Sequence, residues 1–231
     1  MNGTIVIAAA KPWTIVYAER FKAERKELDV RIIFDRRDMT EAFLKCVNPK
    51  YIFFPHWSWY IPQEIYERYN CIVFHPTDLP SGRGGSPIQN LISAGFEETV
   101  ISAIKVVKEI DAGNIYAKRK LSLLGGGEEV FLRFQSIIFN DIIPYIISND
   151  IVPTPQKGES HEFKRRTPEM SEIQSDLSIQ QVFNFIRMLD VCEYPNAFIK
   201  FGDYTLTFSR PSLKSDGIIA DVVISRRINN D

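Results

Sequence analysis

The first 150 residues alternate short, nearly uninterrupted apolar runs with segments of helical periodicity. The apolar runs span residues 4–8, 30–34, 51–54 and 71–74, with Arg31 as the one charged residue among them. Pro12 is a typical first helical residue, and residues 128–147 predict a long helix that is kinked or ended near Pro144. Uninterrupted runs of this length are typical of parallel strands that are covered on both faces, and the helical segments between them supply the cover. This alternation predicts a doubly wound α/β fold with a mostly parallel sheet. In such folds, ligands bind beyond the carboxyl ends of the strands.

A change of composition after residue 153 predicts a second, smaller part of the chain. Residues 155–170 are polar and basic, which is typical of a linker. Ser178 and Gln181 have the spacing of a capping box, and the residues that follow predict an amphipathic helix. Further strands are expected at 197–209 and 217–225. The expected organisation is one domain over residues 1–150, followed by a linker and a small C-terminal α+β subdomain over residues 151–231.

Charge and cysteine content narrow the class of protein. Lys and Arg total 28 against 29 Asp and Glu. The resulting net charge of −1 predicts that the protein does not bind DNA or RNA through its overall charge. No apolar run reaches the roughly 18 residues of a membrane helix, and residues 1–10 lack the pattern of a secretion signal. Cys46, Cys71 and Cys192 lie far apart among apolar residues. They are therefore expected to be buried free thiols in a cytoplasmic protein, and no metal site is expected.

The segment after the fourth apolar run combines a histidine with many prolines and glycines. His75 follows the run directly, and residues 76–87 contain three prolines and three glycines. Proline stiffens such a loop, and glycine lets a ligand approach the backbone. Asp111 and Gly113 follow a later predicted strand, so a histidine and a carboxylate are expected to face one pocket. Glycine-rich phosphate motifs are absent, which disfavours nicotinamide and ATP enzymes.

These residues together resemble the formyltransferases that take a one-carbon group from N10-formyltetrahydrofolate. The family pattern is Asn-x-His, then Ser/Thr-x-Leu-Pro-x-x-Arg-Gly-x-x-Pro, then Asp-x-Gly. His75 and Asp111 are 36 residues apart, as in the family. The other matching residues are Thr77, Leu79, Pro80, Arg83, Gly84, Pro87 and Gly113. The loop and residues 193–198 are most similar to the sugar N-formyltransferase branch, and the loop also resembles formylation domains of peptide synthetases. The resemblance implies a Rossmann-like catalytic domain.

The resemblance and the strand ends assign roles to individual residues. His75 is expected to be the general base, because imidazole accepts protons near neutral pH, and Asp111 is expected to orient it and relay a proton. The residues expected to bind the folate are Leu79, Pro80, Arg83, Gly84, Gly85, Ser86 and Ile110. The residues expected to bind the acceptor are Lys11, Trp57, Ser58, Thr77, Asn90 and Tyr194.

The expected reaction is N-formylation of an amino sugar carried by a nucleotide, with N10-formyltetrahydrofolate as donor. Formylation of another amine stays open: methionyl-tRNA, glycinamide ribonucleotide or a carrier-bound aminoacyl group. The charge balance and the short C-terminal region argue against tRNA. The expected partner is therefore a nucleotide sugar, with neither a nucleic acid nor a membrane. The oligomeric state stays open, with a homodimer as one outcome.

One position departs from the family pattern. The asparagine two residues before the histidine is Val73 in this chain. In the family this asparagine helps to hold the formyl oxygen, and the loss of such a donor costs about 10²–10³ in rate. Another polar group is therefore expected beside Val73, from Ser58, His56, Ser86 or Asn90. A non-catalytic protein that binds folate or a nucleotide sugar is the alternative.

Overall fold

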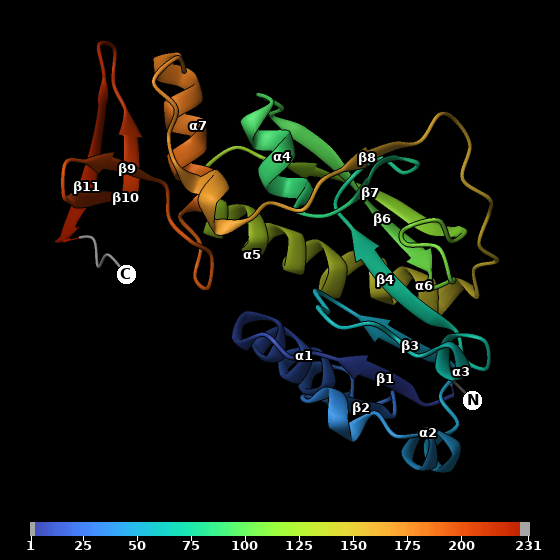
Figure 1. The fold of residues 1–231 in the computed structure, drawn as a ribbon. Coiled ribbons are helices and arrows are strands. Elements are labelled where there is room, and N and C mark those ends of the chain that lie inside the picture. The colour runs from blue at the N-terminus through green and yellow to red at the C-terminus, as the bar shows by residue number, and fades with distance from the viewer. Residues whose placement is uncertain (1–2, 227–231) are drawn as a thin grey trace. The chain divides into compact units, whose positions relative to one another are not determined.

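The main sheet has six strands in the order β2-β1-β3-β4-β6-β7, in a computed structural model that describes residues 3–226 (Figure 1). Its strands are β1 Ile5–Ala8, β2 Val30–Ile33, β3 Tyr51–Phe54, β4 Cys71–His75, β6 Glu98–Lys105 and β7 Ile115–Ser122. β1 is parallel to β2 and β3, and β3 is parallel to β4. β6 is antiparallel to β4. The predicted α/β fold with a mostly parallel sheet is confirmed.

The order of the strands creates a switch point at the carboxyl ends of β1 and β3. β2 lies on one side of β1 and β3 on the other, so the chain winds in opposite directions from this point. Open α/β sheets bind ligands at such points. Both strands are fully buried, as their uninterrupted apolar sequences predict. Each fully buried phenylalanine, such as Phe53, stabilises the fold by about 1.5–3 kcal/mol.

The helices up to residue 93 are α1 Pro12–Glu24, α2 Glu41–Val47, α3 Gln63–Tyr66 and α4 Pro87–Ser93, and clear capping signals mark α1 and α2. Pro12 lies in the first turn of α1, as predicted, where its missing N–H group costs nothing. Thr40 caps α2 by accepting a hydrogen bond from the backbone of Phe43, and Asn48 ends α2 in the left-handed conformation. A 3₁₀ turn at Arg36–Asp38 lies between β2 and α2.

The helix predicted over residues 128–147 is composite. α5 Gly127–Ile137 continues into a π-helical segment, Ile138–Ile142, and then into α6 Ile143–Asn149. Pro144 lies in the first turn of α6, so the predicted break takes the form of the π-helical segment before it. By length and composition alone, the combined helix could cross a bilayer. However, 56% of its most apolar 18-residue stretch is buried inside the protein. It is therefore a helix of the protein core.

The C-terminal part combines one helix with an antiparallel sheet in the order β11-β10-β9. These elements are α7 Ile179–Leu189, β9 Phe198–Phe201, β10 Tyr204–Leu213 and β11 Ile218–Arg226. The predicted capping box is present, because Ser178 and Gln181 each accept a hydrogen bond from the other's backbone N–H. The expected linker contains β8 His161–Phe163, which pairs with β5 Ser81–Gly84, and a 3₁₀ turn at Pro168–Ser171.

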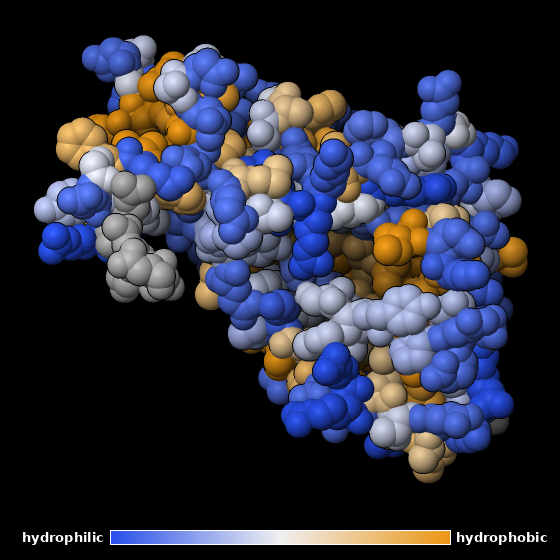
Figure 2. All heavy atoms as spheres, in the orientation of Figure 1, coloured by the Kyte–Doolittle hydropathy of each residue, from blue (hydrophilic) through white to orange (hydrophobic). Residues whose placement is uncertain are grey.

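Large apolar side chains are exposed on this three-stranded sheet. Figure 2 shows hydrophobic residues gathered among hydrophilic ones in the region where Figure 1 places β9–β11. The most exposed of them are Phe201, Ile219, Val223 and Ile224. This part of the chain therefore buries a smaller share of its apolar side chains than the main sheet does.

The contacts group the chain into two compact units, and each is described by itself. The first comprises the described residues up to Gly84, Val100–Leu121 and Leu132–Glu162, and it holds most of the main sheet. The second comprises Gly85–Thr99, Ser122–Phe131 and the described residues from Phe163 onward. The contacts do not divide the chain at residue 150, and the expected domains 1–150 and 151–231 stay a prediction.

The cysteines follow the prediction only in part. Cys71 is buried in β4, and burial raises the pKa of its thiol to about 12. Cys46 and Cys192 are exposed, so the expectation that all three are buried is wrong. Apolar neighbours in sequence do not determine which way a helical residue faces. In α2 the core-facing residue is Leu44, and Cys46 lies two residues further along the helix, on a different face.

Candidate active site

His75 and Asp111 meet beside the carboxyl end of β4. His75 is the last residue of β4 and is 7% exposed, and Asp111 lies in the turn between β6 and β7. Nδ1 of His75 lies 3.4 Å from a carboxylate oxygen of Asp111. Both side chains are largely shielded from water, which strengthens the interaction between them. The arrangement can hold a proton between an imidazole and a carboxylate.

The carbonyl of Gly82 fixes the hydrogen position on His75. Nε2 of His75 lies 2.7 Å from this carbonyl oxygen, which can only accept a hydrogen bond. Nε2 therefore carries the hydrogen. In the neutral ring the lone pair is then on Nδ1, on the side of Asp111. Thr77 donates to the same carbonyl at 3.3 Å, which holds the loop in place.

The turn that carries Asp111 has an unfavourable backbone conformation and close packing. Asp111 has φ +54°, which costs about 1–2 kcal/mol for a residue with a Cβ atom. Its carboxylate accepts a hydrogen bond from the backbone N–H of Gly84 at 3.0 Å. A Cβ atom on Gly113 would lie 1.6 Å from the carbonyl oxygen of Lys105. The glycine of the Asp-x-Gly sequence is thus required, because only glycine lets this turn lie against β6.

A buried serine, which sequence reasoning did not identify, supports the loop after His75. Ser102 of β6 donates to the carbonyl of Thr77 at 2.7 Å and accepts from the backbone N–H of Leu79 at 3.4 Å. The carbonyl of Leu79 accepts from Lys118 at 2.7 Å. The peptide bond between Leu79 and Pro80 is cis. The predicted folate-binding residues of this loop are therefore held by contacts from β6 and β7.

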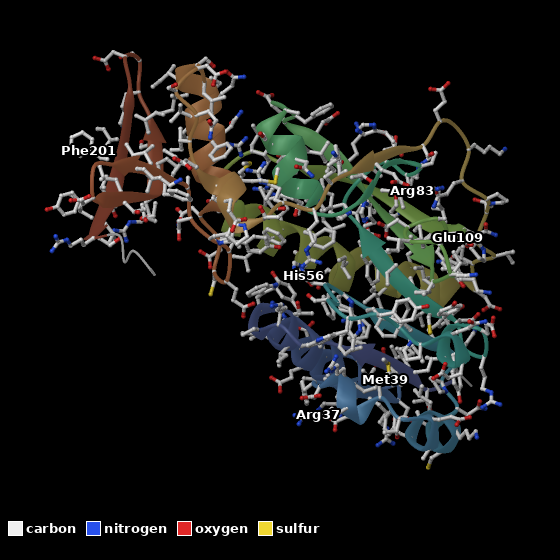
Figure 3. All side chains as sticks on the ribbon, viewed as in Figure 1. Arg37, Met39, His56, Arg83, Glu109 and Phe201 are labelled. Atoms are coloured by element: carbon white, nitrogen blue, oxygen red, sulfur yellow. The ribbon has the colours of Figure 1, made fainter. Side chains whose placement is uncertain are left out.

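Arg83 lies at the edge of this group, on β5 (Figure 3). Its Nη2 donates to Oε1 of Gln156 at 2.7 Å. Its Nε is buried, and within residues 3–226 it has no hydrogen-bond partner. Ile110 is 75% exposed, beside the Asp111 turn. Arg83 thus retains one buried donor that a ligand can use.

Four predicted site residues belong to the second unit. Asn90 donates to the carbonyls of Gly85 and Lys164, and Ser86 accepts from the backbone of Arg166. Their polar groups are therefore engaged within the protein. Tyr194 packs against Phe131 with 5.7 Å between ring centroids, and burial raises the pKa of Tyr194. It borders a cavity of about 310 Å³, which Asp190 and Asn196 also line.

Predicted acceptor-binding residues follow β1 and β3, at the switch point of the sheet. Lys11 precedes α1, with its amino group 5.9 Å from the ring centroid of Trp13. Trp13 meets His56 edge to face at 5.6 Å, and His56 lies just beyond β3 (Figure 3). Trp57 is half-buried and Ser58 is exposed. The ring contact shows that the segments after β1 and β3 adjoin one another.

The surroundings of Val73 are apolar. Val73 pairs with Phe54 in the sheet register and packs against a hydrophobic cluster, as do Trp57 and Val106. Trp57 meets Phe54 edge to face at 5.6 Å. Nε1 of Trp57 is buried without a hydrogen-bond partner among the described residues. An unpartnered buried N–H costs about 1–3 kcal/mol, so this indole is a donor that a ligand can satisfy.

Two family models and a solved structure match the chain. The model described as formyl transferase matches residues 16–130, and the C-terminal domain of methionyl-tRNA formyltransferase matches residues 168–225. The methionyl-tRNA formyltransferase from Clostridium thermocellum is 50% identical, with a TM-score of 0.95, over 97% of this chain and 100% of that chain.

Other relatives are more distant. A curated methionyl-tRNA formyltransferase of Sulfurihydrogenibium is 29% identical over 169 residues, which are 69% of this chain and 53% of the relative. The chain spans about half the length of the curated relatives it matches. HypX from Aquifex aeolicus, solved with tetrahydrofolic acid, is 19% identical with a TM-score of 0.73, over 91% of this chain and 38% of that chain. The likeness to HypX shows a shared fold.

These comparisons correct the expected acceptor. The relatives at 50% and 29% identity are methionyl-tRNA formyltransferases, so the nucleotide-sugar acceptor and the exclusion of a nucleic-acid partner are wrong. Net charge describes the whole chain, whereas phosphates are recognised by a few local groups. The motif from His75 to Gly113 was expected to carry the residues for formyl transfer, and such residues do not distinguish one amine from another.

Proposed function

Because the chain belongs to the formyltransferase family, we propose that it transfers a formyl group from N10-formyltetrahydrofolate to the amine of methionyl-tRNA. The observation that carries this proposal is the 50% identity to the Clostridium thermocellum protein over the whole of that chain. The pairing of His75 with Asp111 supports it, since it offers a base and a charge partner. The proposal includes a cytoplasmic location, which suits three free cysteines.

The residues around the loop after β4 fit a folate donor. Gly82 and Gly84 have positive φ values, and neither places a side chain between its backbone and a ligand. The buried Nε of Arg83 is a donor for a ligand oxygen. When bound, N10-formyltetrahydrofolate supplies an activated formyl carbon. Leu79, Pro80 and Ile110 are the proposed apolar walls of its pocket.

His75 takes the proton that the acceptor amine releases during attack. Its Nε2 donates to Gly82, so Nδ1 is the basic atom. The amine therefore approaches from the side of Asp111, where Nδ1 faces a carboxylate oxygen at 3.4 Å. General base catalysis of this kind contributes about 10²–10⁴ in rate. In this arrangement the Gly82 carbonyl orients the base.

Asp111 stabilises the charged imidazole that results. Proton uptake at Nδ1 places a hydrogen between the ring and the Asp111 carboxylate, which turns a contact between two acceptors into an ion pair. The backbone N–H of Gly84 keeps the carboxylate in position. From this pair the proton passes to the nitrogen that leaves the formyl group, directly or through water.

A formylation assay tests the proposal. The purified chain is incubated with N10-formyltetrahydrofolate and methionyl-tRNA, and formylmethionine is measured after the ester bond is hydrolysed. We expect product with methionyl-tRNA and none with uncharged tRNA. His75→Asn should react at least about 100-fold more slowly at an unchanged melting temperature. Wild-type turnover in His75→Asn would remove the assigned base, and folate binding without any formylmethionine would overturn methionyl-tRNA as the acceptor.

A further inference from the structure

Gln156 lies outside the motif from His75 to Gly113, in the segment that follows α6. Thr154 and Ile115, the first residue of β7, exchange two backbone hydrogen bonds of 2.9 and 2.7 Å. Pro153 and Pro155 flank Thr154 and favour an extended chain on either side of it. Gln156 is two residues beyond this anchor and half-buried. The backbone hydrogen bonds of Thr154 therefore fix the side chain of Gln156 beside the turn between β6 and β7.

The amide of Gln156 makes three hydrogen bonds, all to the candidate active site. Its Nε2 donates to the carbonyl of Asp111 at 2.7 Å and to the carbonyl of Gly113 at 2.9 Å. Its Oε1 accepts from Arg83 at 2.7 Å. A primary amide offers two donors and an acceptor, so both of its ends are used here. Neither a carboxylate nor an aliphatic side chain can make the same set.

These contacts close a ring of interactions around the carboxylate of Asp111. Gly84 follows Arg83 in the chain, and its backbone N–H donates to that carboxylate at 3.0 Å. Gln156 joins Arg83 to the carbonyl of Asp111, so the Asp111 residue is held at its backbone and at its side chain. Asp111 has a left-handed backbone, a conformation that reverts unless surrounding contacts hold it.

We infer that Gln156 is a positioning residue for formyl transfer. By clamping the Asp111 turn against Arg83, it keeps the Asp111 carboxylate facing Nδ1 of His75. The inference rests on the proposed function for its kinetic consequence, whereas the clamp itself is a property of the protein without substrate. Loss of the clamp lets the turn relax, and the carboxylate then moves away from the imidazole that must carry charge during the reaction.

Two substitutions at Gln156 separate its contacts. Gln156→Leu removes all three hydrogen bonds, and Gln156→Glu keeps an acceptor for Arg83 but lacks both donors to the turn. In the formylation assay both variants should lose at least about 10-fold in kcat, with a smaller change in KM for either substrate. Gln63→Leu is the matched control, because Gln63 is an exposed amide on α3, outside the candidate active site, whose side chain donates to Glu67. It should retain wild-type kcat.

A double substitution shows whether Gln156 acts through Asp111. In the Asp111→Ala background, Gln156→Leu should change kcat by less than about twofold, because there is no carboxylate left to position. Equal losses in the two backgrounds would overturn the inference. If Gln156→Leu does not fold, Gln156→Glu carries the same comparison.

A measurement without substrate keeps the inference testable if methionyl-tRNA is not the acceptor. The NMR signal of the Gly84 amide reports its hydrogen bond to the Asp111 carboxylate. In Gln156→Leu this signal should shift toward its position in Asp111→Ala, and in Gln63→Leu it should stay at the wild-type position. An unchanged Gly84 signal in Gln156→Leu would overturn the clamp, whatever the assay shows. Failure of wild-type protein to form formylmethionine would instead overturn the proposed function alone.

Discussion

At the scale of single residues, one hydrogen bond decides how His75 can react. The Gly82 carbonyl accepts from Nε2, and this leaves Nδ1 beside Asp111 as the atom that can take a proton. Catalytic histidines are usually oriented by a carboxylate on one nitrogen and react at the other. Here the orienting group is a backbone carbonyl, and the carboxylate lies on the reactive side. Asp111 is thereby placed to contact both the imidazole and the incoming amine.

The indole of Trp57 is the donor that we expect to replace the family's asparagine. Negative charge develops on the formyl oxygen as the amine attacks, and a donor in a water-poor site stabilises it. Trp57→Phe keeps an aromatic ring but removes the buried Nε1–H. Formyl transfer should fall by about 10–100-fold. The melting temperature should stay the same or rise, because the substitution removes an unpartnered buried donor.

Trp59→Phe is the matched control for this substitution. The ring centroids of Trp59 and Trp57 are 4.7 Å apart, and Trp59 is 38% exposed. Trp59 therefore offers the same kind of ring without a buried, unpartnered N–H group. Its formyl transfer rate should remain within about twofold of wild type. Full activity in Trp57→Phe would show that the formyl oxygen is held by another group.

What could be predicted at this scale depended on local sequence patterns. The meeting of His75 and Asp111 was predictable because a spaced motif contains both. Ser102 and Gln156 were not, because each acts alone, from a strand or a segment whose sequence has no motif around it. The acceptor was predicted wrongly for a related reason: the motif encodes the chemistry at the formyl carbon, and not the shape of the amine's carrier.

At the scale of elements, the turn between β6 and β7 allows no side chain at Gly113. A Cβ atom there would lie 1.6 Å from the carbonyl oxygen of Lys105, which is backbone and cannot move without distorting β6. Gly113→Ala should lower the free energy of unfolding by at least about 2 kcal/mol. For a chain of this size that is a fall in melting temperature of roughly 4–8 °C. Gly217→Ala, in open space, should have little effect. Equal melting temperatures for the two variants would contradict the packing argument.

Two side chains, one on β3 and one on β4, should lower the free energy of unfolding at alkaline pH. Burial raises the pKa of Cys71 to about 12, and burial with the nearby Asp150 raises the pKa of Tyr51 to about 12. The unfolded chain loses these protons at about pH 8.5 and 10. Since the unfolded state then binds fewer protons, the free energy of unfolding should decrease as pH rises from about 9 toward 12.

Urea unfolding at pH 8, 9, 10 and 11 checks this dependence. In Cys71→Ala the decrease between pH 9 and 10 should be shallower than in wild type, because the buried thiol is gone. Cys46→Ala removes an exposed thiol and should keep the wild-type slope. A wild-type slope in Cys71→Ala would show that other groups dominate the alkaline transition.

The elements that could be predicted are those whose signals are local. Apolar runs marked the strands, and Pro12 and the Ser178 capping box marked helix starts. The short helix α2 was not predicted, because its seven residues contain too few turns to show a period. The antiparallel direction of β6 could not be predicted either. The apolar pattern of a strand is the same whichever way the strand runs, and only the path of the preceding loop determines its direction.

At the scale of the whole molecule, a net charge of −1 must be reconciled with the proposed tRNA acceptor. A transferase that acts on the end of a tRNA needs only a few phosphate contacts, and these can come from a short basic segment in a neutral protein. Lys164 and Arg165 are exposed, in the segment before α7. Arg165 also acts electrostatically on Tyr194, a residue predicted to contact the acceptor. We therefore expect this segment to contribute phosphate contacts.

Salt dependence tests that expectation. Between 50 and 200 mM salt, KM for methionyl-tRNA should rise by roughly 10-fold if about two phosphates are neutralised, because counterions are released on binding. KM for N10-formyltetrahydrofolate should change far less. Replacing Lys164 and Arg165 with alanine should lower the salt slope by about 1–2 and raise KM for methionyl-tRNA at low salt. The matched control replaces Lys22 and Lys26, two exposed lysines in the first unit, so that the net charge changes equally. If both pairs lower the slope to the same extent, overall charge and not the segment before α7 attracts the tRNA.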